Sequence, residues 1–411
     1  MRFRSAQIAA AALAACAALS GCGKTLSGQA GGQTPGATPG VGTGGSVGIA
    51  TSNTTRVGGS DSTSDAAGIA LAVYPGLTPA TRPQAVVLVN GEDWPAALAT
   101  SVFAASPLGA PLLYSGAGET LPLTSAQALE ALKPTGARAL GGTQLLRIGA
   151  GGAPSGYKAS SITGASPAAL AAAVERIWSG VQGHTPRQVI VTAADGPPAM
   201  AMPAAGLAAQ SGAPILFVER SAVPEATAGL LSRLARPSIY IAGPRSLIGE
   251  RVARALGRYG QVTRIAGSTP TTNAVAVARF SDGSFGWGVI EPGHGFVFAN
   301  AARPLDAPAA AILSASGDFS PLLLLENPNG LPPVLSGYLS DLQPGTPTSG
   351  PVHTVYNRGW LIGDETAISA TTQAQLDSLL EVSSRPTSEP AIATPTTPAN
   401  EPATTANEPT P

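Results

Sequence analysis

Short apolar runs alternate with longer segments of small residues between about residues 56 and 382 of the chain. In the first part of this region, the pattern predicts a helix of small residues at 66–73, a strand at 86–89, a helix at 94–105 and a strand at 111–114. Pro95 suits the first turn of the second helix, because a backbone N–H has no partner within the helix there.

A third helix is predicted to begin at Thr124, where Gln127 three positions later completes a capping-box pattern. A last strand at 137–140 then closes on Gly141 and Gly142. Strands that alternate with helices of this length indicate βαβ connections and a parallel sheet. The strands are apolar at every position, as expected when helices cover both faces of a sheet. The fold class predicted for this unit is therefore α/β, of the flavodoxin or Rossmann type.

The unit is repeated three times in tandem. The sequence Gly-Ala-Pro-Leu-Leu at 109–113 returns as Gly-Ala-Pro-Ile-Leu at 212–216, and the strand at 86–89 returns at 189–192, so both shift by 103 residues. The third copies of the two strands, at 296–299 and 321–324, lie 107 residues further on. Each copy also opens and closes on glycine: Gly59, Gly164 and Gly267 at the beginnings, and Gly141 with Gly142, Gly243 and Gly363 at the ends. The copies are predicted to span 56–160, 161–262 and 263–382.

Residues 1–22 have the pattern of an export signal. Arg2 and Arg4 precede an apolar run at 8–19, which is shorter than the roughly 20 residues that a membrane-spanning helix needs. The run ends in Leu-Ser-Gly-Cys at 19–22, which resembles the lipobox of bacterial lipoproteins. This resemblance implies cleavage before Cys22 and a lipid on its thiol, which would hold the protein on the outer side of the cell membrane. The alternative is a plain secretory signal in which Cys22 has no role.

Two flanking segments lack the apolar residues of a folded core. Residues 23–55 are rich in Gly, Thr and Ser, and residues 383–411 are rich in Pro and Thr. Such compositions bury too little apolar surface to offset the entropy of ordering the chain. Both segments are predicted to be disordered, the first as a linker and the second as a tail.

The repeats carry motifs that can be compared with a known family. The first copy has Arg-Val-Gly-Gly at 56–59 and Gly-Glu-Asp-Trp-Pro-Ala-Ala-Leu-Ala at 91–99, and the third has Arg-Ile-Ala-Gly at 264–267. With the repeated Gly-Ala-Pro motif, this pattern resembles the type-two cell-wall-binding repeats of bacterial surface proteins, over residues 56–382. The chain departs from that family at Ala96, where an aspartate is usual, and in an insertion at 280–295.

The family resemblance implies a fold and a function. It implies three units packed around a pseudo-threefold axis, which bind anionic polymers of the cell wall, or a glycan associated with peptidoglycan, without a covalent bond. Arginine would provide the contacts with phosphate or carboxylate groups, since lysine is nearly absent from the chain.

Composition limits the alternatives. The chain has 23 basic and 24 acidic residues and a net charge of −1, and its arginines are scattered, which argues against nucleic-acid binding. Both cysteines, Cys16 and Cys22, lie in the predicted signal peptide. The rest of the chain therefore has no disulfide and no thiolate metal site.

Candidate binding residues follow from the geometry of parallel sheets. Ligands lie beyond the carboxyl ends of the strands, where helix N-termini present their amide groups. The alternative is that Asn90, Asp93 and Asp195 merely cap the helices that follow them. The candidates at strand ends and among the arginines are Arg56, Asn90, Asp93, Asp195, Arg264, Asn300 and Arg303.

The sequence offers little for catalysis. The three histidines have no metal-ligand spacing, no serine stands in a nucleophile elbow, and no cofactor motif is present. Of the tryptophans, Trp178 is predicted to be a helix core residue, and Trp287 in the insertion is a candidate for stacking on sugars. We therefore expect a binding protein that is not an enzyme. Two other hypotheses remain open: a lipoprotein that binds a small solute, and an enzyme that modifies the cell wall with a carboxylate pair.

Overall fold

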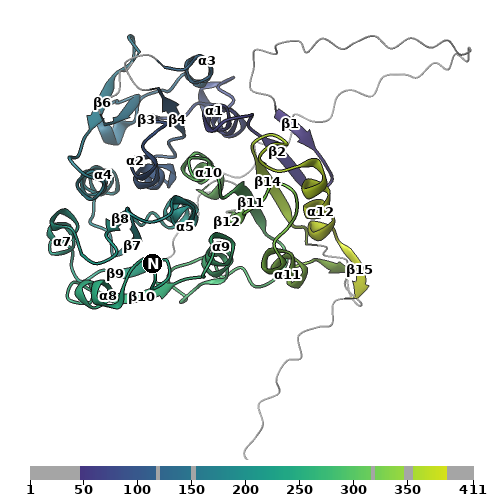
Figure 1. Ribbon diagram of the computed structural model, residues 1–411. Helices are drawn as coiled ribbons and strands as arrows, with labels where there is room; N and C mark the ends of the chain where they lie inside the picture. The colour runs from purple at the N-terminus through teal and green to yellow at the C-terminus, as the bar shows by residue number, and fades with distance from the viewer. Residues whose placement is uncertain (1–46, 117–120, 150–153, 316–319, 347–354, 387–411) are drawn as a thin grey trace, which may run out of the picture. The chain divides into compact units, whose positions relative to one another are not determined.

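The computed structural model describes residues 47–116, 121–149, 154–315, 320–346 and 355–386, and these form three parallel sheets flanked by helices (Figure 1). The α/β fold with three units that the sequence predicts is confirmed. Cys22 and the rest of the predicted signal peptide lie outside the described residues. Within the described ranges, no helix has the length and apolar character needed to cross a membrane.

The three units have corresponding elements in the same order. The first contains α1 (Ser62–Val73), η1 (Pro79–Thr81), β3 (Val86–Asn90), α2 (Trp94–Ala99), η2 (Thr100–Ala104), β4 (Leu112–Ser115), α3 (Leu123–Leu132), η3 (Arg138–Leu140), β5 (Leu145–Ile148) and β6 (Ala159–Ile162). The second contains α4 (Pro167–Gln182), β7 (Gln188–Ala193), α5 (Pro198–Ala201), α6 (Pro203–Ser211), β8 (Ile215–Val218), α7 (Glu225–Leu231), β9 (Ser238–Ala242), α8 (Glu250–Leu256) and β10 (Gln261–Ile265). The third contains α9 (Pro270–Arg279), β11 (Gly295–Asn300), α10 (Asp306–Ala315), β12 (Leu322–Leu325), α11 (Pro333–Asp341), β13 (Gly345–Thr346), β14 (Arg358–Ile362), α12 (Ala370–Leu380) and β15 (Ser383–Pro386). Two further strands, β1 (Val47–Ala50) and β2 (Thr54–Val57), precede the first unit.

The strand that opens each repeat joins the sheet of another unit. The sheet orders are β4-β3-β5-β6, β8-β7-β9-β10 and β12-β11-β14-β2-β1, in which β1 alone is antiparallel to its neighbour. β2 lies near the beginning of the described chain and β14 near its end, so the first repeat completes the sheet of the third. The helix after each opening strand instead packs on the sheet of the repeat to which it belongs. α1 contacts β4, α4 contacts β8 and α9 contacts β12. The three units therefore close into a cycle.

One helical segment from each unit lies at the centre of the cycle. α6 packs against α10, and both pack against η2; Figure 1 shows α2, α5 and α10 between the three sheets. The helices approach closely because their facing residues are small: a Cβ atom on Gly206 of α6 would lie 2.7 Å from Ser314 Oγ of α10. These contacts support the pseudo-threefold packing that the family resemblance implies.

A continuous apolar core connects the units. Val89, Val191 and Val297, from the middle strand of each sheet, all belong to it. Two smaller apolar clusters complete the first and third units. The strands β4, β8 and β12 are buried at every residue, which confirms that both faces of the sheets are covered.

The last strand predicted for the first unit is wrong. The short 3-10 helix η3 occupies Arg138–Leu140, and Gly141 ends it with a φ of 62°. Gly141 and Gly142 then turn the chain so that Ala137 pairs with Thr143. The strand is β5, formed by the more apolar run beyond this turn, and it is followed by Gly149.

The capping box predicted at Thr124 is also wrong. α3 begins one residue earlier, at Leu123, and Pro122 stands at its N-cap without a side-chain hydrogen bond. The helix predicted at 94–105 is divided into α2 and η2.

The insertion in the third repeat packs on the second unit. Phe285 stacks on the ring of Tyr240 of β9, with centroids 3.9 Å apart, and the Tyr240 hydroxyl donates to Asp282 Oδ2 at 2.6 Å. Trp287 packs against the apolar core and against the cluster of the third unit. The insertion thus connects two units of the cycle.

Candidate binding site

Arg56 extends from β2 into the loop that follows β14. Its guanidinium donates to the carbonyl oxygens of Gly363 (2.9 Å), Asp364 (2.8 Å) and Ile368 (2.7 Å), and to Gln373 Oε1 (2.9 Å from Nη2). The residue is only 7% exposed. Burial lowers the pKa of Arg56, although two nearby carboxylates oppose this change. The arginine therefore holds the loop against the strand that closes the cycle.

Arg264 of β10 has the same position in the second unit. It donates to the carbonyl oxygens of Gly243 and Ile248, both at 2.9 Å, and Glu250 Oε1 lies 3.7 Å from its Nη2. Burial lowers the pKa of Arg264 as well. Two of the predicted binding residues thus fasten equivalent loops inside the protein.

The first unit lacks this arginine. Ser161 stands at the equivalent position of β6 and pairs with Arg147 of β5. The buried Nε of Arg147 has no hydrogen-bond partner among the residues that the structure describes. The three units therefore differ at this position.

Arg303 lies between two buried carboxylates. It forms ion pairs with Asp65 of α1 through Nη2 and with Asp306 of α10 through Nε, the latter at 3.1 Å. The Gly59 amide donates to Asp65 Oδ1 at 2.6 Å, and the Ser62 hydroxyl donates to Asp306 Oδ1 at 2.6 Å. This cluster fastens the first helix of the first repeat to the third unit.

One guanidinium neutralises only one of these two carboxylates. Burial, followed by the charge of Asp306, raises the pKa of Asp65 to about 8, while Arg303 opposes the shift. Burial also raises the pKa of Asp306. At neutral pH the pair therefore keeps a proton that its two carboxyl groups share.

Asp65 and Asp306 were missed by the sequence analysis, although the repeats contain a signal for Asp65. Asn273 is its counterpart in α9, six residues after Gly267, and its Oδ1 accepts a hydrogen bond from the Gly267 amide at 3.0 Å. A polar residue at the same place in two otherwise small-residue helices indicates a repeated backbone contact.

The polar residues after β3 bond to the local backbone. Asn90 Oδ1 accepts from the Glu92 amide at 3.1 Å, and Asp93 caps α2 by accepting from the Ala96 amide at 3.0 Å. The capping role considered for Asp93 is confirmed.

The corresponding residues in the other units have different partners. Asp195 does not cap the next helix, because Pro197 stands at that N-cap; its Oδ2 accepts from the Arg220 amide at 3.2 Å. Asn300 is 4% exposed and donates to the Ala367 carbonyl at 2.8 Å. Asn300, Arg56 and Arg303 all surround the loop at 363–368, whereas the other four candidates lie in the first and second units.

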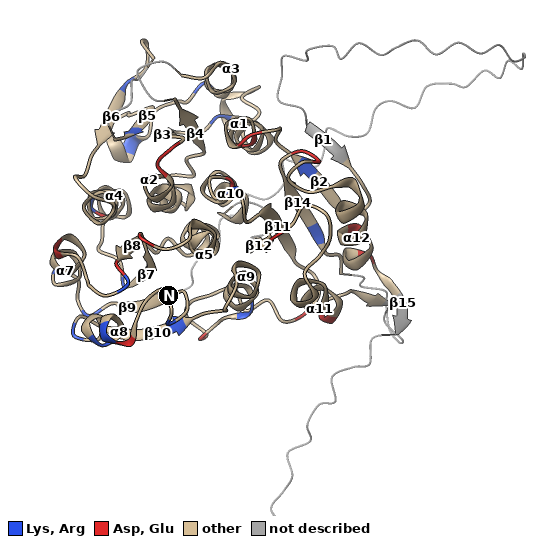
Figure 2. Cartoon of the chain, in the orientation of Figure 1, with Lys and Arg blue, Asp and Glu red and all other residues tan. Residues whose placement is uncertain are grey.

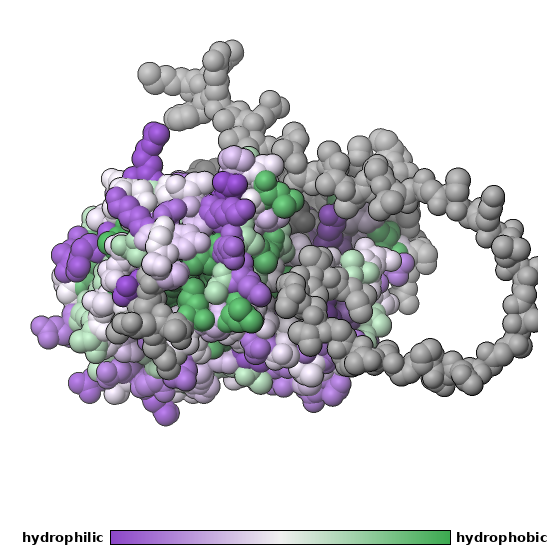
Figure 3. All heavy atoms as spheres, turned by 90° about the horizontal axis from the view of Figure 1, so that it is seen from above, coloured by the Kyte–Doolittle hydropathy of each residue, from purple (hydrophilic) through white to green (hydrophobic). Residues whose placement is uncertain are grey.

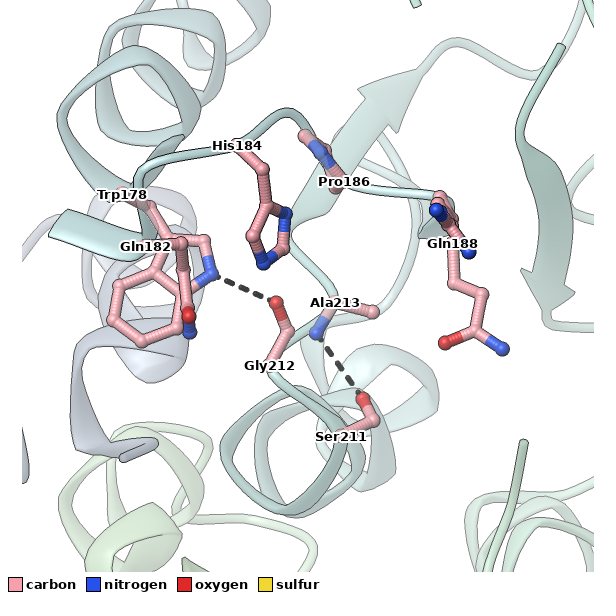
Figure 4. Close-up of a pocket in the computed structure, with 9 residues that line it drawn as sticks. Trp178, Gln182, His184, Pro186, Gln188, Ser211, Gly212 and Ala213 are labelled. Carbon is pink, nitrogen blue, oxygen red and sulfur yellow. Dashed lines mark hydrogen bonds between the residues drawn. The ribbon is translucent and has the colours of Figure 1, made fainter. Parts of the chain in front are cut away.

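A pocket of about 290 Å³ opens beside the amino end of β7 (Figure 4). Its Trp178 is 1% exposed, and the indole donates to the Gly212 carbonyl at 2.8 Å. Figure 4 shows this hydrogen bond and the neighbouring His184 ring. Trp178 is thus the core residue that the sequence predicts. Two polar side chains of the pocket already have partners, since Gln188 donates to the Ser284 carbonyl at 3.3 Å and His184 Nδ1 lies 3.1 Å from the Thr185 carbonyl, and its exposed cation is Arg187.

A larger pocket, of about 530 Å³, lies beside α8 in the second unit. Figure 2 shows Lys and Arg segments gathered on and around α8. None of the residues that line this pocket is acidic. Its lining residues are Ser221, Ala222, Val223, Ala228, Arg251, Val252, Arg254, Ala255, Arg258 and Tyr259. Arginines are scattered along the sequence as a whole, but the spacing of Arg251 and Arg254 was a signal for one helical face, and Arg258 follows in the turn after the helix.

Two observations concern metal-ligand groups and apolar surface area. The described part of the chain contains no group of three or more His, Cys, Asp or Glu residues that could hold a metal ion. Figure 3 shows one face of the molecule, on which apolar atoms gather in a small area among hydrophilic ones.

The fold defines a class of protein: tandem α/β units closed into a cycle by a strand and a helix that join different units. Cwp6 and Cwp8 from Clostridium difficile have a similar fold, with TM-scores of 0.59 and 0.60 and 17% sequence identity for each. Each comparison covers 80% of this chain but only 48% of Cwp6 and 52% of Cwp8, so the similarity concerns about half of either protein. No protein-family model and no curated protein matches the sequence.

Proposed function

We propose that the protein is a non-catalytic cell-surface protein whose three α/β units bind anionic polymers of the cell wall without a covalent bond. The observation that carries this proposal is the cycle of three units, a fold similar to that of the cell-wall proteins Cwp6 and Cwp8. The repeat motifs at 56–59, 91–99 and 264–267 support it independently.

The proposal is tested by sedimentation with cell walls. The full chain, purified in detergent, is mixed with walls isolated from the organism that makes it, before and after the anionic polymers are stripped. We expect the protein to pellet with intact walls and to remain in solution with stripped walls. Failure to pellet with either preparation would contradict the proposal.

We further propose that a lipid on Cys22 holds the protein at the outer side of the membrane. The support is the Leu-Ser-Gly-Cys sequence after an apolar run of signal-peptide length. In cells grown with a labelled fatty acid, the Cys22→Ser variant is expected to take up no label, whereas a Cys16→Ser variant is expected to take it up as the unchanged protein does. Label on the Cys22→Ser variant would mean that Cys22 is not the lipidated residue.

A further inference from the structure

We infer that the pocket beside α8 is the site in the second unit that binds a phosphate or carboxylate group of an anionic polysaccharide. This inference rests on the proposed function and assigns it to a place on the surface. Below, the pocket that includes Arg251, Arg254, Arg258 and Tyr259 is called the arginine pocket.

The arginines of this pocket come from α8 and from the turn that follows it. Arg251 and Arg254 are three residues apart in α8, a spacing that places them on one face of the helix. Arg258 lies in the turn beyond Leu256, and all three residues are exposed and line the pocket. Tyr259 lies beside them and packs partly against the apolar core, which fixes its position. The arginine pocket therefore combines exposed cationic groups with a partly buried aromatic side chain.

No carboxylate neutralises these arginines within the described residues. The nearest acidic residue of α8, Glu250, forms its ion pairs with Arg245 at 2.6 Å and with Arg264 at 3.7 Å. Of all the ion pairs among described residues, none includes Arg251, Arg254 or Arg258. Glu219 and Glu225 occur on nearby segments of the chain but do not line the pocket. The three positive charges are thus available to a ligand.

The opposite wall suits a sugar chain. Ser221, Ala222 and Val223, from the loop after β8, supply a hydroxyl and small apolar groups. Asp195 accepts a hydrogen bond from the Arg220 amide at 3.2 Å, and the Gly249 amide donates to the Arg220 carbonyl at 3.3 Å, so this loop is tied to α8. The pocket is held open by these contacts rather than formed by side chains alone.

The shape and composition favour a polysaccharide over a membrane surface. A planar guanidinium binds phosphate or carboxylate through two parallel hydrogen bonds. The pocket is concave, and Leu77, Leu123, Ile290, Val334, Val355 and Tyr356, the large apolar residues that are exposed, do not line it. A membrane-binding surface would instead place apolar side chains beside its positive charges.

The test compares two double variants of the full chain. Arg251→Ala with Arg254→Ala removes two charges from the pocket, and Arg138→Ala with Arg176→Ala removes two exposed charges elsewhere. Alanine favours helix, so α8 should persist in the pocket variant, and circular dichroism and thermal unfolding verify this. Binding is measured to isolated walls, to a poly(glycerol phosphate), to polygalacturonate and to vesicles of anionic phospholipid, each at low and moderate salt.

We expect the affinity of the pocket variant for walls to fall roughly tenfold, since each charge-assisted hydrogen bond contributes measurably to affinity. The control variant should bind as the unchanged protein does. The two model polymers identify the group: loss of binding to poly(glycerol phosphate) alone indicates phosphate, and loss of binding to polygalacturonate alone indicates carboxylate. Arg251→Lys with Arg254→Lys should recover only part of the affinity, because lysine keeps the charge without the two parallel donors.

Other outcomes would overturn the inference in distinguishable ways. If the unchanged protein pellets with walls and both double variants do so equally, the arginine pocket is not the site, while the proposed function stands. If the unchanged protein binds no wall, the proposed function fails together with the inference. If the pocket variant loses binding to vesicles of anionic phospholipid but not to walls, the ligand is a lipid headgroup and the assignment to polysaccharide is wrong.

Discussion

Arg56, Arg303 and Asp65 are ionisable side chains that the fold buries wholly or in part, and each holds together parts of the chain that are distant in sequence. Only 11% of the residues are charged. A buried charge lowers stability unless its hydrogen-bonding groups find partners. In this protein, the carbonyl groups of one loop and a pair of aspartates provide those partners.

The shared proton of the Asp65 and Asp306 pair predicts a pH effect on stability. In the unfolded chain the pKa of Asp65 returns to about 3.9, whereas the folded value is about 8. Folding therefore takes up a proton at this site, so the contribution of Asp65 to stability is most favourable at low pH and falls as the pH rises through this interval, by at most about 1.4 kcal/mol per pH unit. We expect Asp65→Asn to flatten the decline of melting temperature between pH 5 and pH 8.

The repeats support the choice of asparagine, since Asn273 makes the equivalent backbone contact. Glu130→Gln, which removes an exposed carboxylate of α3, is the control and should keep the pH profile of the unchanged protein. An Asp65→Asn profile with the original slope would show that Asp65 is ionised in the folded state.

Removal of the Arg56 side chain should destabilise the closing sheet. Arg56→Met leaves the carbonyl groups of Gly363, Asp364 and Ile368 without this donor. A buried polar group that loses its partner costs about 1–3 kcal/mol. We expect a clear decrease in the midpoint of chemical unfolding, whereas Arg176→Met on the exposed face of α4 should change it by less than about 0.5 kcal/mol. Equal midpoints for the two variants would contradict the role assigned to Arg56.

At the scale of elements, small residues determine how closely the central helices approach. Gly206 of α6 faces Ser314 of α10, and the surrounding residues of both helices are mostly buried alanines. Close contact between helices gives many weak dispersion interactions, and any additional atom must displace a neighbour. Many of the alanines in the sequence thus lie in the central helices of the cycle, where their small side chains allow close packing.

Two glycine-to-alanine substitutions separate this packing effect from helix propensity. Gly206→Ala should lower stability by about 1–3 kcal/mol, because its new methyl group would overlap Ser314. Gly229→Ala in α7 should raise stability by about 0.5–1 kcal/mol, since nothing lies within 4 Å of the added atom and alanine is the better helix former. Thermal unfolding of both variants measures the difference. The contact between α6 and α10 would be looser than described if both substitutions were stabilising.

Sequence periodicity predicts most of these elements but not their local boundaries. The strands β3, β4, β7 and β8 lie where the repeated apolar runs place them. The prediction failed at β5, because a turn at Gly141 and Gly142 follows a weakly apolar segment that resembles a strand. The arginine pocket also needed the structure, since Ser221 and Arg254 are brought together only by the tertiary fold.

At the scale of the whole cycle, β2 completes a sheet whose other parallel strands come from the third unit. Every repeat has an opening strand, so the repeats in the sequence do not show which of the three sheets a given opening strand joins. The answer depends on the contacts between β2 and β14, which join residues about 300 positions apart. Loss of β2 would leave β14 as an exposed edge strand.

Truncation tests this closure. A chain that begins at Gly58 lacks β1, β2 and Arg56, and we expect a lower melting temperature together with self-association through the exposed edge of β14. A chain that begins at Thr51 lacks only β1 and should melt close to the unchanged protein. Light scattering and thermal unfolding distinguish the two chains. Equal behaviour of both would show that β2 contributes little to the cycle.

The pairing of β2 also has a mechanical consequence. A pull that reaches the described residues from the N-terminal side first meets β1, whose antiparallel ladder with β2 opens one bond at a time. The next strand is parallel to β14 and bonded along its length, so tension along it loads several hydrogen bonds together in shear. Arg56 adds a cross-link from that strand to the loop at 363–368. If a lipid on Cys22 anchors the chain, as proposed above, a force on it would encounter a compliant hairpin first and a stiff clamp behind it.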